Sequence, residues 1–242
     1  MTEENATLEG ALSVRAALDA GSRDIAEIRI AVDADSPAIQ RVAELADRRG
    51  ISVRRVTRDA LDAEGRTHGG IVASVGPRHF LALAELTLPE RPFVAMLDGV
   101  EDPYNFGQAV RSLYAAGVHG LVVRRRNWMS AAATVARASA GASERIVTAV
   151  VDDPAEAVAT LRKRGLAFAC AHRRDATPLT EADLTVPLFV VIGGERRGIS
   201  RTLASDADLR LVIQYGRRFE PALDTTSATA VIAFEVARQR RI

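Results

Sequence analysis

Cysteine and lysine are almost absent from this chain of 242 residues, in which Cys170 and Lys163 are the only residues of their kinds. A single cysteine excludes an internal disulfide and a metal site built from several cysteines, and we predict no metal site. Because Cys170 lies in the apolar run 166–170, we expect it to be a buried core thiol rather than a reactive one.

Long apolar runs are also missing: none approaches the roughly 20 residues that are needed to span a bilayer. Residues 1–5 are acidic, unlike the start of a signal peptide. We therefore expect no membrane association and a cytoplasmic location. Apolar residues nevertheless make up 48% of the chain, which is enough for one large domain or two smaller ones to bury a core.

Net charge is close to zero, +1 at pH 7, which argues against attraction of nucleic acid by the molecule as a whole. The basic residues are almost all arginine, however, and they occur in clusters that can bind phosphate locally. One cluster, Arg196-Arg197, adjoins a glycine-rich motif. The alternative is that the arginines reflect a GC-rich genome and are mostly solvated surface side chains.

The first 79 residues alternate between helical and strand patterns, which predicts a small α/β unit. Helices are expected over residues 8–20, 38–49 and 58–63, and strands over residues 28–32, 51–56 and 68–75. Gly76-Pro77 is expected to end the unit. Because the segment that follows carries prolines, we predict a domain at 1–79, a linker at 80–91 and a second domain at 92–242.

From residue 93 onward the alternation is more regular and predicts a parallel sheet with helices on both faces. Strands are expected over 93–97, 120–123, 146–151, 166–171, 188–192 and 210–213, and helices over 105–116, 130–140, 155–164, 200–204 and 226–240. In sheets of this kind the ligand lies beyond the carboxyl ends of the strands. That rule directs attention to the loops after Leu97, Ile192 and Ile213.

The first of these loops leads from a buried strand into a helix that carries Asn105 and Arg111. Helical spacing lets Gln108 and Arg111 face a ligand while Val110, Leu113 and Tyr114 face the core. A purely structural interpretation is also open, because Asp102-Pro103 and Asn105 are common turn and N-cap residues and Arg111 could simply be exposed.

The second loop is rich in glycine and follows an apolar strand, with Glu195 at its tip. Its glycines, Gly193, Gly194 and Gly198, allow the backbone to approach a ligand closely. Their spacing matches neither the dinucleotide fingerprint nor a phosphate-binding P-loop, and no lysine follows the last glycine. This weakens the case for a nucleoside triphosphate or nicotinamide ligand. Glu195 could instead be an ion-pair partner of a nearby arginine.

The three loops together resemble the motifs of the SpoU/TrmH 2′-O-ribose methyltransferases, within the SPOUT superfamily. Asp-Pro-x-Asn-x-Gly followed by Arg, Gly-x-Glu-x-x-Gly, and Phe234-Glu-x-x-Arg-Gln occur in this order between about Phe93 and Arg240. Residues 138–144 are similar to the family segment between motifs. The first part resembles the family's small ribosomal-protein-like substrate-binding domain, with His-Gly-Gly-Ile at 68–71 near the family's His-Gln-Gly-Ile.

The resemblance implies a parallel-sheet α/β domain with a deep trefoil knot, usually in a homodimer whose active site lies near the interface. The implied cofactor is S-adenosylmethionine, and the implied substrate is RNA, with ribosomal RNA expected before transfer RNA. Gly193, Ile213 and Leu223 match positions whose backbones bind the cofactor, and Gly194 and Gly198 shape the same cradle. Asn105, Arg111 and Glu195 match the polar residues around the transfer site. RNA contacts are expected from Arg66, His68, Arg196 and Arg197.

An arginine is essentially always charged, so Arg111 is a poor general base. We expect it to stabilise the developing oxyanion and bind an adjacent phosphate, with Glu195 and Asn105 orienting Arg111 and the ribose. The proton would leave to a phosphate oxygen or to water.

The third motif departs from the family pattern. Ala222-Leu223-Asp224 replaces Ser-Leu-Asn, Ile213-Gln214-Tyr215 replaces Ile-Pro-Met, and one residue is inserted before Leu223. A knotted RNA-binding protein with weak or lost cofactor binding is therefore an alternative, whereas a nicotinamide-dependent oxidoreductase lacks its fingerprint. Since backbone contacts can survive side-chain changes, the methyltransferase is favoured. The sequence does not select the modified nucleotide.

Overall fold

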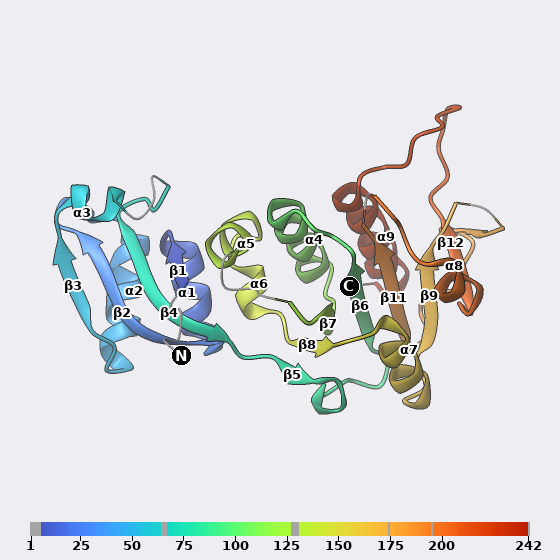
Figure 1. The fold of residues 1–242 in the computed structure, drawn as a ribbon, viewed down its shortest axis with the longest axis horizontal. Coiled ribbons are helices and arrows are strands. Elements are labelled where there is room, and N and C mark those ends of the chain that lie inside the picture. Colours follow the sequence, from blue (N-terminus) through green and yellow to red (C-terminus); the bar gives the residue numbers. More distant parts are fainter. Residues whose placement is uncertain (1–5, 64–66, 127–130, 174, 195, 242) are drawn as a thin grey trace. The chain divides into compact units, whose positions relative to one another are not determined.

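The computed structural model describes residues 6–63, 67–126, 131–173, 175–194 and 196–241. These residues form two compact units, the first within residues 1–79 and 127–145 and the second within residues 80–126 and 146–242 (Figure 1). The chain therefore passes between the units after residues 79, 126 and 145.

The first unit contains a four-stranded sheet in the order β1-β4-β2-β3, in which β4 is antiparallel to β1 and β2, and β3 is parallel to β2. Its elements are β1 (Ala6–Glu9), α1 (Ala11–Ala20), β2 (Arg23–Ala31), α2 (Pro37–Arg48), β3 (Val53–Val56), α3 (Arg58–Asp62), β4 (Ile71–Arg78), α5 (Ala132–Ala138) and α6 (Ala142–Arg145). One expectation was wrong here: residues 8–9 belong to a strand that Gly10, at φ +82°, separates from α1. The strand β4 runs through Gly76-Pro77 to Arg78, one residue before this part of the unit ends at residue 79.

The core of the first unit joins the sheet to residues that follow much later in the chain. Leu8, Ile30 and Val72 are fully buried in it, and Ala132 and Ala136 of α5 belong to the same apolar cluster. Residues 131–145 are therefore part of this unit, although they lie between two strands of the other sheet in sequence. The division differs in this respect from the one expected, which placed all residues after 91 in the second domain.

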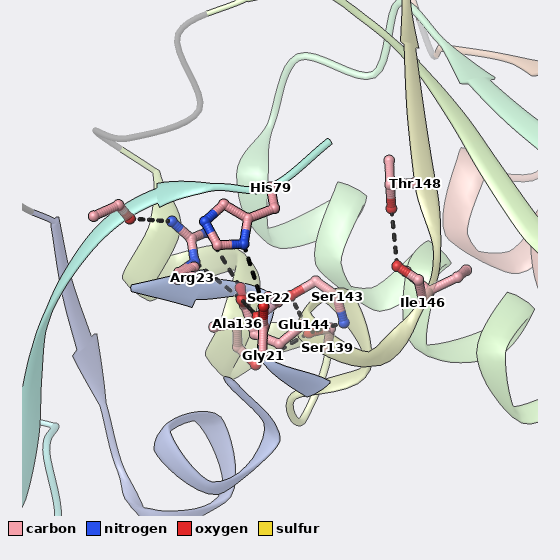
Figure 2. Close-up of polar contacts among 11 residues, drawn as sticks. Gly21, Ser22, Arg23, His79, Ala136, Ser139, Ser143, Glu144, Ile146 and Thr148 are labelled. Atoms are coloured by element: carbon pink, nitrogen blue, oxygen red, sulfur yellow. Dashed lines mark hydrogen bonds and ion pairs between the residues drawn. The ribbon is translucent and has the colours of Figure 1, made fainter. Parts of the chain in front are cut away.

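A buried ion pair connects Arg23 of β2 to Glu144 of α6 (Figure 2). Arg23 Nε and Nη2 donate to the Glu144 carboxylate at 2.9 and 3.2 Å, and Ser22 Oγ donates to it at 2.7 Å. The Arg23 and Glu144 side chains are only 4% and 1% exposed. Desolvation raises the pKa of Glu144, but attraction to Arg23 and these hydrogen bonds outweigh it, so the pKa is lowered. Burial lowers the pKa of Arg78 to about 10 against the attraction of Glu144.

A Glu144→Ala variant is expected to destabilise the first unit strongly. Removing the carboxylate leaves Arg23 buried without its counter-charge, which costs about 3–5 kcal/mol of unfolding free energy. Because the folded pKa of Glu144 is lowered, its contribution is complete above the unfolded value of about 4.3 and is lost as pH falls through the folded pKa. Urea unfolding followed by circular dichroism at several pH values measures both effects.

The matched control is Asp33→Ala, which breaks the exposed Arg58–Asp33 pair of the same unit. Its unfolding midpoint is expected to stay close to that of the wild type. Equal midpoint shifts in the two variants would contradict the importance of the buried pair.

The second unit is built on an eight-stranded sheet in the order β10-β12-β9-β11-β6-β7-β8-β5, and every neighbouring pair is parallel. Its strands are β5 (Leu81–Ala82), β6 (Phe93–Asp98), β7 (Gly120–Arg124), β8 (Thr148–Val151), β9 (Ala167–Ala171), β10 (Thr177–Pro178), β11 (Leu188–Gly193) and β12 (Leu209–Val212). Its helices are η1 (Leu83–Glu85), α4 (Pro103–Ala115), α7 (Pro154–Lys163), α8 (Arg201–Ser205) and α9 (Thr225–Arg240). The predicted parallel sheet is confirmed.

Helices cover both faces of this sheet. Alternate residues of each strand point to opposite sides, so each face presents apolar side chains that a helix can bury. Val94 and Met96 of β6 share a buried cluster with Leu161 of α7. On the other face α4 packs against α9, and the Arg240 guanidinium of α9 lies 5.8 Å from the centre of the Phe93 ring.

Cys170 of β9 is fully buried, as predicted, and burial raises its pKa to about 11. The segment expected to be a linker contains β5, which pairs with β8. Together with η1, which follows it directly, this strand belongs to the second unit rather than standing outside both units.

Candidate functional site

The three loops of interest follow β6, β11 and β12, and they leave the same edge of the sheet because the strands are parallel. All three lead into helices with a side-chain N-cap, and the loop after β11 ends at Ser200, whose Oγ accepts a hydrogen bond from Leu203 N at 3.2 Å. Asp102 Oδ1 accepts a hydrogen bond from Asn105 N at 2.7 Å, with Pro103 in the first helical turn of α4. Asp224 Oδ1 likewise accepts from Ser227 N at 2.8 Å where α9 begins. These short polar caps satisfy backbone donors and set where each helix starts.

A pocket of about 790 Å³ lies between the second and third loops. All five residues expected to bind the cofactor line it: Gly193, Gly194, Gly198, Ile213 and Leu223. Other parts of its wall come from His172 and Arg173, which follow β9, and from Tyr215 and Phe219 of the third loop. Small-molecule pockets typically measure about 300–1,000 Å³, so this one can accept a nucleoside-sized ligand.

The glycines of the second loop are required mainly by the chain itself. A Cβ on Gly193 would lie 2.4 Å from the carbonyl carbon of Gly198, and one on Gly194 would lie 2.0 Å from the carbonyl oxygen of Gly99. Gly194 N also donates to Asp98 O at 2.7 Å, and Gly198, at φ +59°, donates to Gly194 O at 2.9 Å. The first and second loops therefore pack backbone against backbone, in addition to the ligand approach that the sequence predicts.

The unusual third loop is fixed by contacts of its own. Tyr215 Oη accepts a hydrogen bond from Leu223 N at 3.0 Å, and the Tyr215 and Phe219 rings are 5.9 Å apart. Asp224 accepts from both the backbone and the hydroxyl of Ser227, and these bonds lower its pKa. Two of the residues that depart from the family pattern, Tyr215 and Asp224, thus have local partners, and the pocket that they border is formed.

Asn105 lines a second, smaller cavity of about 120 Å³ together with Arg196 and residues 99–102 of the first loop. The first turn of α9 is hydrogen-bonded to one residue of this cavity and to one residue of the larger pocket. Thr226 Oγ1 donates to Asn105 O at 3.4 Å, and Thr225 Oγ1 donates to Gly193 O at 3.2 Å. The backbone carbonyls of Asn105 and Gly193 are therefore bound to the same helical turn.

Arg111 is exposed on α4 and does not line either of these cavities. By helical spacing it lies on one side of α4 with Tyr104 and Tyr114. The expectation that Tyr114 faces the core was wrong, because it is 42% exposed, whereas Val110 and Leu113 are fully buried as predicted.

The residues expected to contact RNA have different environments. Arg196 and Arg197 are exposed, and Arg196 forms an exposed pair with Glu101 at 3.4 Å. His68 is 2% exposed; its Nδ1 accepts from Gly70 N at 2.9 Å and its Nε2 lies 2.8 Å from Asp62 Oδ1. Because both ring nitrogens bind the chain itself, we correct the expectation that His68 contacts RNA. Arg66 and the catalytic candidate Glu195 lie outside the described residues.

Several residues of the site were missed by the sequence interpretation. Thr226 was assigned only to a helix and Thr225 only to the loop before it, although a run of hydroxyl residues after Asp224 could have indicated contacts at the first helical turn. Tyr215 was noted only as a departure from the family pattern. In the part of the chain that the structure describes, no group of three or more His, Cys, Asp or Glu residues could bind a metal ion.

Comparison with known proteins identifies the family. The family model described as "SpoU rRNA Methylase family" matches residues 92–234, which is more than half of the chain. The chain belongs to this family. A second model, described as "RNA 2′-O ribose methyltransferase substrate binding", matches residues 7–81. The resemblance inferred from the three motifs is thereby confirmed.

Named relatives align with most of this chain. The protein named 23S rRNA (guanosine-2′-O-)-methyltransferase RlmB from Xanthomonas axonopodis pv. citri is 32% identical over 248 residues and 99% of each chain is covered. A Bacillus subtilis protein named putative TrmH family tRNA/rRNA methyltransferase YacO is 32% identical over 208 residues, with 83% of each chain covered.

Solved structures share the fold of the SpoU chain. AviRb from Streptomyces viridochromogenes, described as a SpoU methyltransferase, has a TM-score of 0.82 at 19% identity, with 98% of this chain and 90% of AviRb covered. An AdoMet-bound rRNA methyltransferase from Sinorhizobium meliloti has a TM-score of 0.81 at 23% identity, with 97% and 87% covered. At these identities the structures support the α/β fold alone.

Family membership establishes the general activity. The chain is an RNA ribose 2′-O-methyltransferase, and its cofactor is S-adenosylmethionine. The residues present fit this cofactor, because the pocket has the size of a nucleoside site and part of its wall is the backbone of Gly193, Gly194 and Gly198. None of the described helices is long and apolar enough to cross a membrane.

Proposed function

We propose that this enzyme methylates a ribose 2′-hydroxyl of ribosomal RNA, and that the methyl donor binds in the 790 Å³ pocket. The observation that carries the proposal is the joining of Gly193 and Asn105 through the first turn of α9, which brings the cofactor pocket and the Asn105 cavity to one place. Relatives of nearly equal length are named 23S rRNA guanosine methyltransferases, which supports ribosomal RNA as the substrate and guanosine as the first nucleotide to test. Its expected location is the cytoplasm.

A ribose hydroxyl is a weak nucleophile, so it needs exact placement and help in losing its proton. S-adenosylmethionine supplies an activated methyl group. Asn105 orients the ribose in the small cavity, and Arg111 binds the adjacent phosphate and stabilises the negative charge that develops on O2′. With the methyl donor held by Gly193, Gly194 and Leu223, O2′ would accept the methyl group and its proton would leave to a phosphate oxygen or to water. Glu195 is assigned to orienting Arg111.

We also propose that the enzyme is a homodimer and that Arg111 acts at the pocket of the partner subunit. Four large side chains are exposed on the adjoining helices α4 and α9, and grouped exposure of this kind marks an interaction surface. They are Tyr104, Tyr114, Val231 and Phe234. Because Arg111 lies on the same side of α4 as the two tyrosines, pairing through this surface would place it at the interface.

A Phe234→Glu variant tests the dimer. Phe234 is 52% exposed, so glutamate at this position is compatible with the folded subunit but places a charge inside the proposed interface. We expect sedimentation velocity to show a dimer for the wild type and mainly a monomer for the variant. Leu12→Glu is the matched control, because Leu12 is 65% exposed on α1, and it should remain dimeric. A wild-type chain that sediments as a monomer would contradict the proposal.

Transfer of labelled methyl groups tests the function itself. Purified enzyme is incubated with tritiated S-adenosylmethionine and either unmodified 23S ribosomal RNA or a transfer RNA mixture. We expect label in ribosomal RNA, recovered after alkaline hydrolysis as a resistant dinucleotide because a 2′-O-methyl group blocks cleavage. Absence of label, together with no calorimetric binding of S-adenosylmethionine even when RNA is present, would favour the RNA-binding protein without catalysis.

A further inference from the structure

Three consecutive arginines at the end of β7 have two different kinds of partner. Arg124 Nε donates to Asp98 Oδ1 at 2.6 Å and Nη2 to Oδ2 at 3.4 Å, so it binds the carboxylate through both oxygens. Arg126 Nη1 donates to the carbonyl oxygen of Val100 at 3.0 Å. Arg125 instead pairs with Asp152 at 2.9 Å, and both of these side chains are more than 70% exposed. Arg124 and Arg126 thus contact the first loop, and Arg125 does not.

The segment that the two arginines contact is also the one against which the glycine loop packs. The carbonyl oxygen of Asp98 accepts from Gly194 N at 2.7 Å, and the carbonyl oxygen of Gly99 occupies the place of a Cβ on residue 194. Residues 98–100 therefore contact both the two guanidinium groups and the cofactor loop. A shift of this segment would move both the cofactor loop and the start of α4.

Arg126 extends this contact to the first turn of α4. Its guanidinium carbon lies 5.5 Å from the centre of the Phe106 ring, and Phe106 is 4% exposed and follows Asn105 directly. Desolvation lowers the pKa of Arg126, opposed by attraction to Glu101. A planar guanidinium can bind a carbonyl at its edge and an aromatic ring at its face at the same time. One side chain therefore contacts both the first loop and α4, the helix that carries Asn105.

We propose that Arg124 and Arg126 are positioning residues for methyl transfer, which fix residues 98–106 and, through them, Asn105. The inference rests on the proposed function of Asn105. Neither arginine belongs to the motifs that indicated the family, and from sequence alone both read as ordinary members of a basic cluster.

The proposal is tested with Arg126→Gln, and Arg125→Gln is the matched control. Because a displacement of about 1 Å can reduce a rate about 100-fold, we expect Arg126→Gln to lower kcat about 10- to 100-fold while KM for RNA stays within about threefold. Arg125→Gln should change kcat less than about twofold. Arg126→Lys keeps the charge but lacks the planar fork, and its kcat should be intermediate. Wild-type kcat in Arg126→Gln would overturn the proposal.

Two further measurements separate positioning from other roles. Hydrogen–deuterium exchange of the peptide covering residues 99–106 should become faster in Arg126→Gln and not in Arg125→Gln, whether or not the RNA is the right substrate. Unchanged exchange would overturn the proposal independently of the proposed function. A loss that appears as weaker RNA binding, with the salt dependence reduced by about one ion, would instead assign Arg126 to a direct phosphate contact and overturn it. If Arg126→Gln fails to fold, Arg126→Lys serves for every readout.

Discussion

A Gly194→Ala variant is expected to lose most of its affinity for S-adenosylmethionine. The added Cβ would lie 2.0 Å from the carbonyl oxygen of Gly99 and 3.0 Å from Val100 N, which are backbone atoms that cannot rotate away. The glycine loop and the first loop must separate, at a cost of about 3 kcal/mol for overpacking, or about 100-fold in affinity. Isothermal titration calorimetry with the cofactor alone measures the change.

Gly216→Ala is the matched control for this experiment. Gly216 lies in the third loop between Tyr215 and Phe219, and nothing lies within 4 Å of a Cβ placed on it. We expect cofactor affinity close to the wild-type value. If Gly194→Ala binds the cofactor as tightly as Gly216→Ala does, the second loop is not part of the cofactor site.

An Arg111→Ala variant is expected to bind both ligands and transfer almost no methyl groups. Removing one preorganised donor to a developing oxyanion costs about 10²–10³ in kcat. Arg111→Lys keeps the charge but loses the fork that binds a phosphate through two N–H groups, so it should restore only part of the rate. Single-turnover kinetics with saturating RNA measure the chemical step. Near-wild-type transfer by Arg111→Lys, with normal RNA binding, would contradict this role.

Mixing two inactive variants tests whether Arg111 acts across the dimer. Arg111→Ala retains its cofactor pocket, and Gly194→Ala retains its arginine. If the arginine serves the partner subunit, mixed dimers contain one complete site, and an equal mixture should regain about a quarter of wild-type activity. No recovery after verified subunit exchange would place Arg111 at the pocket of its own subunit.

The architecture of the second unit could be predicted because its signals are local. Apolar runs such as residues 188–193 read directly as buried parallel strands, and Pro103 and Pro154 with their capping aspartates mark helix starts. Two-residue strands such as β5 and β10 leave no periodicity to detect, since only their pairing with β8 and β12 defines them. The trefoil knot implied by the family resemblance stays a prediction.

Long-range packing is the part that sequence could not supply. Nothing near Glu144 in the chain indicates that it pairs with Arg23, which is 121 residues away, or that Ala132 and Ala136 join the core of the first unit. Local pattern also fails for His68, which resembles a family recognition position but whose ring is buried against Asp62 and Gly70.

For the candidate site, the sequence supplied candidate residues but not their contacts. The five cofactor residues were identified by family position and lie around one pocket. Glycine is required at 193 and 194 because a Cβ there would meet the backbone of Gly198 or Gly99. This closeness is visible only in the structure. The altered third motif raised doubt about cofactor binding, because a sequence does not show that Asp224 caps α9 and that Tyr215 binds Leu223.

The central claim, methylation of a ribosomal RNA ribose with Arg111 as a catalytic residue, is tested most directly by mapping 2′-O-methylation across total RNA. Three strains are compared, one with the wild-type chain, one with Arg111→Ala and one without the protein. The account predicts at least one ribosomal ribose that is methylated in the first strain and unmethylated in the other two. Identical methylation maps in all three strains would contradict it.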